Sequence, residues 1–234
     1  SLAGNLALAA TGGHAGSLTI DGGRLLTGQD IVSGIAADGA ILVGSNGTVI
    51  VRRASTAGEG AGQTLKAAGM RIDGTLNADY QGFAGGSGYL SPSGWHGGHG
   101  GYTSYASRST YGSVTNPVSL GRGGTYDGGG AIVLKIGGTL TVNGTLSANG
   151  AGDASGGGGA GGSLNIFAET MDGGGTIRAN GGNSTSRHGG GGGRISLLNV
   201  TDNNFTGTLQ VLGGVGVGYS GDLPARSPFP KAIT

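Results

Sequence analysis

The sequence predicts an all-β fold, a single-stranded parallel β-helix (solenoid) with long glycine-rich loops. The first observation is a Gly-Thr-aliphatic motif that opens a short alternating strand in five places, at Thr48, Thr75, Thr145, Thr176 and Thr208. The second is the spacing of these threonines, 27, 70, 31 and 32 residues, which fits one coil per repeat with a long interval between the second and third copies. The third is that glycine interrupts every stretch with helical spacing of apolar residues before three turns are complete.

Aligning the motif copies reveals further columns of equivalent residues. Two columns are aliphatic: Leu76, Leu146, Ile177 and Leu209 form one, and Ala78, Ala148, Ala179 and Val211 form the other. Because side chains alternate between the two faces of a strand, we expect these columns inside the coil and the threonines outside. A third column, Asp79, Asn149 and Asn180, follows the strands. Asn and Asp bond readily within turns, so we expect a structural ladder of stacked side chains at a corner.

These offsets define the expected domain organisation. We expect a β-solenoid domain over residues 1–222, with coils near residues 3–28, 31–56, 62–80, 131–150, 163–182 and 193–214, an aromatic Gly-rich insertion at 81–130, and a Pro-containing extended tail at 223–234. An antiparallel sandwich, the competing all-β fold, would show hairpin pairs instead of a nearly constant offset. Whether residues 81–130 contain a further coil is left open.

Composition excludes several classes of function. With 13 Lys and Arg against 12 Asp and Glu, the net charge of +1 gives no electrostatic footprint for nucleic acid. The chain has no cysteine, which removes disulfides and thiolate metal sites, and no apolar run approaches the roughly 20 residues of a membrane span. We therefore expect neither a cofactor nor a metal. The chain opens at Ser1 without Met, as a processed segment would.

Glycine supplies 59 of the 234 residues, and its long runs lie between the predicted strands. Three glycine-rich segments, 81–130, 151–162 and 181–193, leave the coil after the Asn/Asp column. Collagen is excluded because glycine does not recur at every third position. Two alternatives remain for these runs: flexible loops, or extended threefold helices packed side by side as in polyglycine.

The insertion contains most of the aromatic residues. Our candidates for ligand binding or an interface are Tyr89, Trp95, His96, His99, Tyr102, Tyr105, Tyr111 and Tyr126. Clustered rings on a loop stack on carbohydrate or bury a protein interface, but they also pack among glycines to fix a loop that lacks other side chains. Two histidines separated by two residues could share a metal, yet no Cys, Asp or Glu completes the site nearby.

An enzymatic reading finds little support in the residues. Polysaccharide lyases and hydrolases need close carboxylates, or a base beside Arg and Lys. The acids of this chain are not adjacent, and the remaining arrangement is Lys135 or Arg122 with Asp127. The sequence therefore predicts that the protein is not an enzyme and that no residue is catalytic.

The stretch from Gly130 to Gly150, with the Gly-rich loops and Gly193-Arg194-Ile195 that follow, resembles the glycine-rich repeats of large bacterial adhesin-like and cell-surface β-helix proteins. The resemblance covers residues 62–214. It implies export, a parallel β-helix and an adhesive or structural role, and it carries no catalytic motif.

We therefore expect an extracellular or cell-surface structural or adhesive module, with filament formation as one form of it. The expected partner is a second copy, because the ends of a solenoid expose β edges. Contact would be end to end or through the tail residues Leu223, Pro224, Pro228, Phe229 and Pro230. The alternative is a carbohydrate-binding or polysaccharide-degrading β-helix protein that binds a cell-surface glycan through the aromatic insertion.

Overall fold

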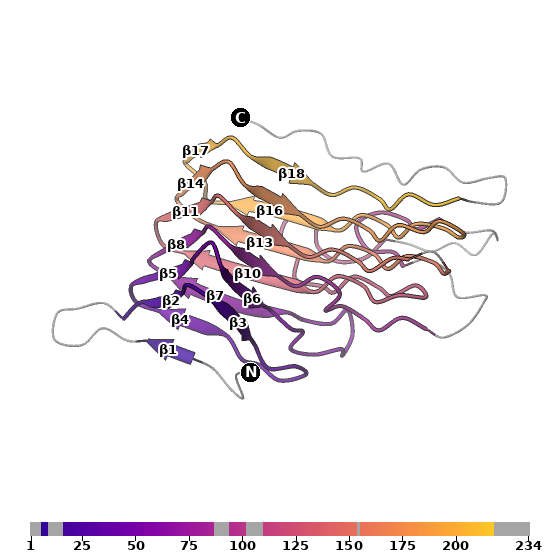
Figure 1. The fold of residues 1–234 in the computed structure, drawn as a ribbon, viewed down its shortest axis with the longest axis horizontal. Coiled ribbons are helices and arrows are strands. Elements are labelled where there is room, and N and C mark those ends of the chain that lie inside the picture. Colours follow the sequence, from indigo (N-terminus) through magenta and orange to yellow (C-terminus); the bar gives the residue numbers. More distant parts are fainter. Residues whose placement is uncertain (1–5, 9–15, 87–93, 102–109, 154, 218–234) are drawn as a thin grey trace.

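The computed structural model describes residues 6–8, 16–86, 94–101, 110–153 and 155–217, and it confirms the parallel β-helix. The described residues contain strands and no helix, arranged as three six-stranded sheets in which every pair of neighbouring strands is parallel. Each coil contributes one strand to each sheet. Figure 1 shows the six coils stacked on one side of the molecule and the glycine-rich segments running away from them on the other.

The strands of each sheet follow the order of the coils. The first sheet comprises β1 (Leu6–Leu8), β4 (Ile35–Ala37), β7 (Gln63–Ala67), β10 (Ala131–Ile136), β13 (Ser163–Phe167) and β16 (Arg194–Leu198). The second comprises β2 (Leu18–Ile20), β5 (Ala40–Val43), β8 (Gly69–Ile72), β11 (Thr139–Val142), β14 (Thr170–Gly173) and β17 (Asp202–Phe205). The third comprises β3 (Gly23–Leu26), β6 (Gly47–Ile50), β9 (Thr75–Asn77), β12 (Thr145–Ser147), β15 (Thr176–Arg178) and β18 (Thr208–Gln210).

The Gly-Thr motif marks the corner at which the chain enters the third sheet. The threonines of the five copies are register partners of one another along this sheet. The glycine before each threonine is required because successive coils approach closely at this corner. A Cβ on Gly144 would lie 2.0 Å from the carbonyl oxygen of Gly74, one coil away.

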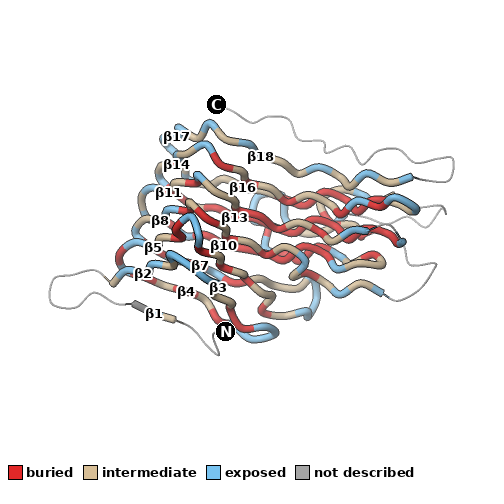
Figure 2. The backbone as a smooth tube through the Cα atoms, viewed as in Figure 1, coloured by how far each residue is buried: buried red, intermediate tan, exposed pale blue. Residues whose placement is uncertain are grey.

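The core is the space enclosed by the three sheets. Aliphatic side chains from each coil fill it in layers, among them Val43, Ile72, Leu146 and Ile177, all fully or almost fully buried. Figure 2 shows this buried interior continuing from the coil into the glycine-rich side. The layers repeat because each inward position sits on its register partner in the next coil.

At the end of the third sheet a ladder of side chains links one coil to the next. Asp79 accepts hydrogen bonds through Oδ1 from the backbone N–H of Asn149 at 2.7 Å and from its Nδ2 at 3.0 Å. Asn149 in turn accepts through Oδ1 from the N–H of Asn180 at 2.9 Å. Asn180 accepts from the N–H of Leu212 at 2.9 Å. The ladder fixes the point at which each glycine-rich segment leaves the coil.

Residues 81–130 leave the coil at this corner. Their described parts, 81–86, 94–101 and 110–130, contain no strand. Within the described residues they therefore add no strand to the three sheets.

Candidate functional site

The glycine-rich segments pack side by side as extended helices with threefold periodicity. The segment 157–162 shows the pattern through its backbone donors: Gly158 donates to His188 at 2.9 Å, Gly159 to Ala151 at 2.8 Å, Ala160 to Arg122 at 2.9 Å, Gly161 to Gly191 at 2.9 Å and Gly162 to Ala148 at 2.7 Å. Residues three apart therefore donate to the same neighbouring segment: Gly158 and Gly161 to 188–191, and Gly159 and Gly162 to 148–151. Three residues per turn without internal hydrogen bonds is the geometry of an extended threefold helix.

The carbonyl groups of segment 157–162 accept hydrogen bonds from further neighbouring segments. Gly158 accepts from Gly94 at 2.8 Å, Gly159 from Gly182 at 2.8 Å and Ala160 from Gly129 at 2.8 Å. Among the described residues, segment 157–162 therefore bonds to 94–98, 121–125, 126–130, 148–151, 179–182 and 188–191. We call these segments, together with 82–86 and 211–217, the glycine bundle. Of the two alternatives for the glycine runs, the described parts adopt packed helices.

Glycine is needed in the bundle because the backbones touch. A Cβ on Gly159 would lie 2.1 Å from the carbonyl oxygen of Asp127, and one on Gly161 would lie 2.2 Å from that of Ala179. Heavy-atom contacts this short do not occur, so any other residue would force the segments apart. Glycine here permits close packing, and its backbone groups are held by hydrogen bonds on several sides.

His96 is built into this bundle. It is fully buried, and its Nδ1 lies 3.0 Å from the carbonyl oxygen of Gly161. A carbonyl can only accept, so Nδ1 carries the proton and Nε2 is unprotonated. Burial lowers the pKa of His96 to about 4. The imidazole is therefore neutral at pH 7 and serves as a hydrogen-bond donor to the backbone.

His99 lies apart from this arrangement and is exposed. Among the described residues, no group of three or more His, Cys, Asp or Glu side chains could hold a metal ion. The two histidines of the insertion thus occupy different environments, one inside the bundle and one at its surface.

Aromatic rings of the insertion gather around Arg122. The guanidinium carbon lies 4.9 Å from the ring centroid of Phe83, 5.8 Å from that of Tyr111 and 5.9 Å from that of Trp95. Tyr111 also contacts the His96 ring at a centroid distance of 5.0 Å and donates its hydroxyl to the carbonyl of Leu120. Burial raises the pKa of Tyr111. In the described part of the insertion these rings surround the Arg122 guanidinium, and Tyr111 also packs against His96 of the bundle.

The segment 111–119 covers part of the outer face of the first sheet. Asn165 donates through Nδ2 to Oδ1 of Asn116 at 2.6 Å, and Ser163 donates to the carbonyl of Ser119 at 2.6 Å. The Arg194 guanidinium donates to the carbonyl of Tyr111 at 2.9 Å. These contacts explain why three polar residues on the outside of the sheet are buried.

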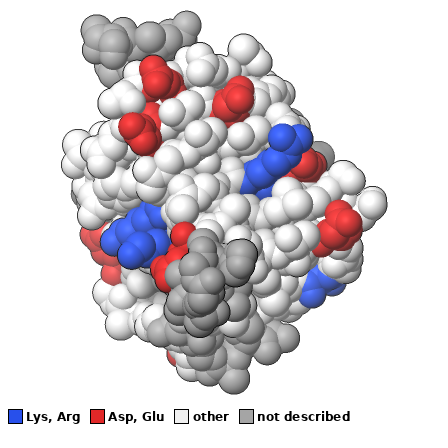
Figure 3. All heavy atoms as spheres, turned by 90° about the vertical axis from the view of Figure 1, so that its left-hand side faces the viewer, with Lys and Arg blue, Asp and Glu red and all other residues white. Residues whose placement is uncertain are grey.

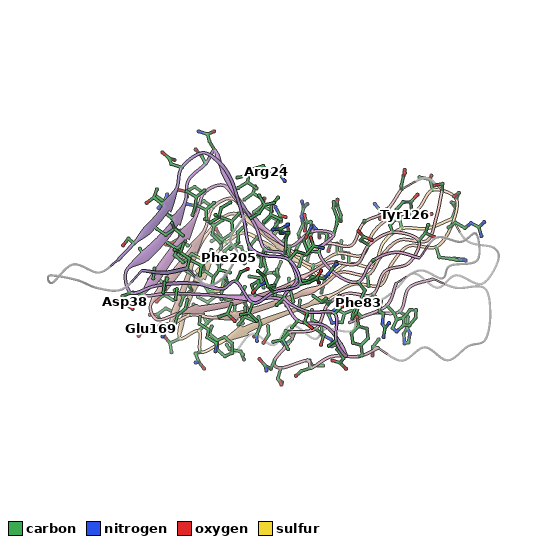
Figure 4. The ribbon with its side chains drawn as sticks, turned by 90° about the horizontal axis from the view of Figure 1, so that it is seen from below. Arg24, Asp38, Phe83, Tyr126, Glu169 and Phe205 are labelled. Atoms are coloured by element: carbon green, nitrogen blue, oxygen red, sulfur yellow. The ribbon has the colours of Figure 1, made fainter. Side chains whose placement is uncertain are left out.

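The other predicted site residues are distributed as follows. Tyr126 is half-buried, with its hydroxyl 2.7 Å from Oγ of Ser155. Asp127 accepts the backbone N–H of Gly85 at 2.7 Å. Figure 4 places Phe83 and Tyr126 on the bundle side of the molecule, and Asp38 and Glu169 at the opposite end. The predicted residues Tyr89, Tyr102, Tyr105, Leu223, Pro224, Pro228, Phe229 and Pro230 lie outside the described residues.

A shallow groove on the outer face of the first sheet was not predicted. Its volume is about 550 Å³, and its lining includes Lys66, Lys135, Phe167 and Asp38. Lys66 and Lys135 are register partners, and Phe167 is the partner of Lys135 in the next coil. The offsets between these three residues, 69 and 32, each differ by one from the corresponding threonine offsets of 70 and 31, so alignment on the Gly-Thr motif does not place them in one column.

The surface carries few charges in the view of Figure 3. Acidic and basic groups are interspersed on this face, in places side by side, and form no extended patch of one sign. None of the described residues belongs to a helix long and apolar enough to cross a bilayer.

Comparison with protein-family models gives no match, and comparisons with curated proteins and with solved structures give none. The resemblance to adhesin-like repeats therefore stays a prediction. The fold defines the chain as a parallel β-helix with a packed glycine bundle on one side.

Proposed function

We propose that the protein is a structural module of the cell surface or extracellular space whose copies associate end to end along the axis on which the coils stack. The observation that carries this proposal is the exposure of the core at the end of the coil. Leu209 is 48% exposed, whereas its column partners Ile177, Leu146 and Leu76 are fully buried. Apolar surface of this kind, beside a β edge, favours contact with another chain.

The arrangement of the insertion supports a structural role over a chemical one. His96 is occupied with the backbone of the bundle, and Arg122 lies among three rings. These are the residue types that a reaction would use, and both are held in packing contacts. A bundle fixed by backbone hydrogen bonds in several directions gives the module stiffness.

The location outside the cell rests on composition. Charged residues make up 11% of the chain, so we expect Ser, Thr, Asn and exposed backbone to cover much of its surface. Fibrous and surface proteins that are exported share this composition.

Sedimentation velocity tests the proposal. We expect the distribution of masses of the purified chain to extend to larger multiples as the concentration rises from the micromolar range. A monomer at every concentration, in buffers of low and of physiological salt, would exclude end-to-end association.

Carbohydrate binding is the second candidate, and the groove is the observation that favours it. A half-buried ring beside two lysines offers a stacking surface and charge for an acidic saccharide. A polysaccharide array comparing the native chain with Phe167→Ala and Trp95→Ala would assign binding to the groove or to the insertion. Binding that survives both changes would exclude both sites, and absence of binding by the native chain would remove this candidate.

A further inference from the structure

The two ends of the described coil expose edge strands of the same kind. β16, β17 and β18 form one end, and β1, β2 and β3 form the other; each is the terminal strand of its sheet. Within the described residues, each of these strands pairs on one side alone. An unpaired edge presents backbone donors and acceptors ready to bond with another strand.

In the first and third sheets the apolar columns match across the two ends. The inward column of the first sheet begins at Leu6 and ends at Leu197. That of the third sheet begins at Leu25 and ends at Leu209. In the second sheet, the column that begins at Leu18 ends at Asn203, and Phe205 supplies apolar surface two residues further on.

The outward positions are also compatible at the two ends. The column of the first sheet that begins at Ala7 ends at Leu198, so two uncharged side chains would meet. In the third sheet the column begins at Arg24 and ends at Thr208, so a cation would meet a hydroxyl. Neither junction brings like charges together.

The glycine bundle leaves room for this arrangement. The connections that follow the third-sheet strands of the first two coils, residues 27–34 and 51–62, are short. The long glycine segments begin after β9, at the third coil (Figure 1). When a second copy is placed on β16–β18, its first two coils, which carry no long glycine segment, lie above the segment 211–217 of the first copy. The bundles of the two copies are then two coils apart.

We infer that β16, β17 and β18 of one copy pair in parallel with β1, β2 and β3 of the next, in the register of the internal coils. This inference rests on the proposed function and names its interface. Leu209 then lies beside Leu25, Leu197 beside Leu6 and Thr208 beside Arg24 of the neighbouring copy. Six coils at about 4.8 Å each give an axial repeat of about 29 Å per copy.

The absence of cysteine from the chain allows a direct test by disulfide trapping. The double variant R24C/T208C places thiols at two exposed positions, one at each end. At the proposed junction their Cα atoms would lie about 5 Å apart, within the range of about 4.4–6.8 Å that a disulfide spans. Within one chain the two positions are separated by five coil steps, about 24 Å, which excludes an internal disulfide.

Under mild oxidation we expect R24C/T208C to give a ladder of covalent multimers on a non-reducing gel. The single variants R24C and T208C should stop at dimers at most. The matched variant T75C/T208C, whose first thiol lies in an internal coil, should also form no ladder. Far-ultraviolet circular dichroism of each variant checks that the coil is retained.

Four outcomes separate the inference from the proposed function. A ladder with R24C/T208C supports the register. Assembly of this variant in sedimentation without a ladder overturns the interface and leaves end-to-end association by another surface. A variant ending at Gly221 tests the tail: if R24C/T208C loses its ladder on this truncation, the tail carries the contact and the inference is overturned. Absence of assembly in the native chain overturns both proposals.

Discussion

The imidazole Nδ1 of His96 lies 3.0 Å from the carbonyl oxygen of Gly161, inside the glycine bundle. Three residues earlier, the carbonyl of Gly158 accepts the backbone N–H of Gly94. The side chain thus takes the position that a backbone donor of the same neighbouring segment would occupy one turn further on. His96, a candidate binding residue from the sequence, therefore contributes a hydrogen bond to the packing of the glycine bundle.

The titration of His96 should make stability depend on pH. Its pKa is about 4 in the folded chain and about 6.5 when unfolded, so the unfolded chain binds more protons between these values. Stability should be independent of this residue above about pH 6.5 and fall as pH drops towards 4, by up to about 3 kcal/mol. Urea unfolding at several pH values should show this slope in the native chain and lose it in His96→Gln.

His99→Gln is the matched control, because His99 is exposed. It should keep the slope of the native chain. An equal slope in the native chain and in His96→Gln would contradict the buried, neutral state of His96.

Gly159→Ala should destabilise the bundle strongly. The added Cβ would meet the carbonyl oxygen of Asp127 at 2.1 Å, and backbone cannot move aside as a flexible side chain can. We expect a loss of about 3 kcal/mol or more in the free energy of unfolding. Gly137→Ala is the control: its Cβ would have no neighbour closer than 3.8 Å, and a small gain is expected. Equal effects of the two changes in thermal and urea unfolding would argue against close packing in the bundle.

Asn149→Ala should break the ladder between coils. Its side chain donates to Asp79 and accepts from the backbone of Asn180, so the change leaves a partly buried N–H without its partner. We expect a loss of about 1–3 kcal/mol, measured by urea unfolding. Asn143→Ala removes one exposed hydrogen bond to Asp73 and should change stability by less than about 1 kcal/mol. A similar loss in both variants would mean that the ladder adds nothing beyond an ordinary surface contact.

Leu146 and Leu209 occupy the same column but differ in burial. Replacing them should therefore affect different properties, the stability of the monomer for Leu146 and the association of copies for Leu209. Leu146→Ala should cost about 2–5 kcal/mol because the side chain is fully buried. Leu209→Ala should cost the dilute monomer less than about 1 kcal/mol, yet weaken association of the native ends. Unfolding and sedimentation of both variants check this. Unchanged association in Leu209→Ala, or equal destabilisation by both changes, would contradict the exposed end.

The coil was predictable because its sequence signal is local and repeated. The Gly-Thr motif aligns with a corner at which successive coils approach closely, and the glycine before Thr145 cannot carry a Cβ there. The same alignment placed Asp79, Asn149 and Asn180 in one column, and the structure joins them by hydrogen bonds.

The sequence left the bundle as one of two alternatives because glycine has no side chain to carry a pattern that would decide between them. Its partners are backbone groups from distant coils, such as Gly161 for His96, 65 residues away. Which of two histidines is buried depends on this long-range packing. The groove could not be predicted for another reason. Lys66 and Lys135 lie in different coils, and their proximity follows from the strand register alone.

Negative-stain electron microscopy of the purified chain over a range of concentrations tests the central claim, end-to-end association, most directly. The account predicts filaments that lengthen with concentration and carry an axial repeat of about 29 Å, six coils of about 4.8 Å. Dispersed particles of a single copy at every concentration would contradict it.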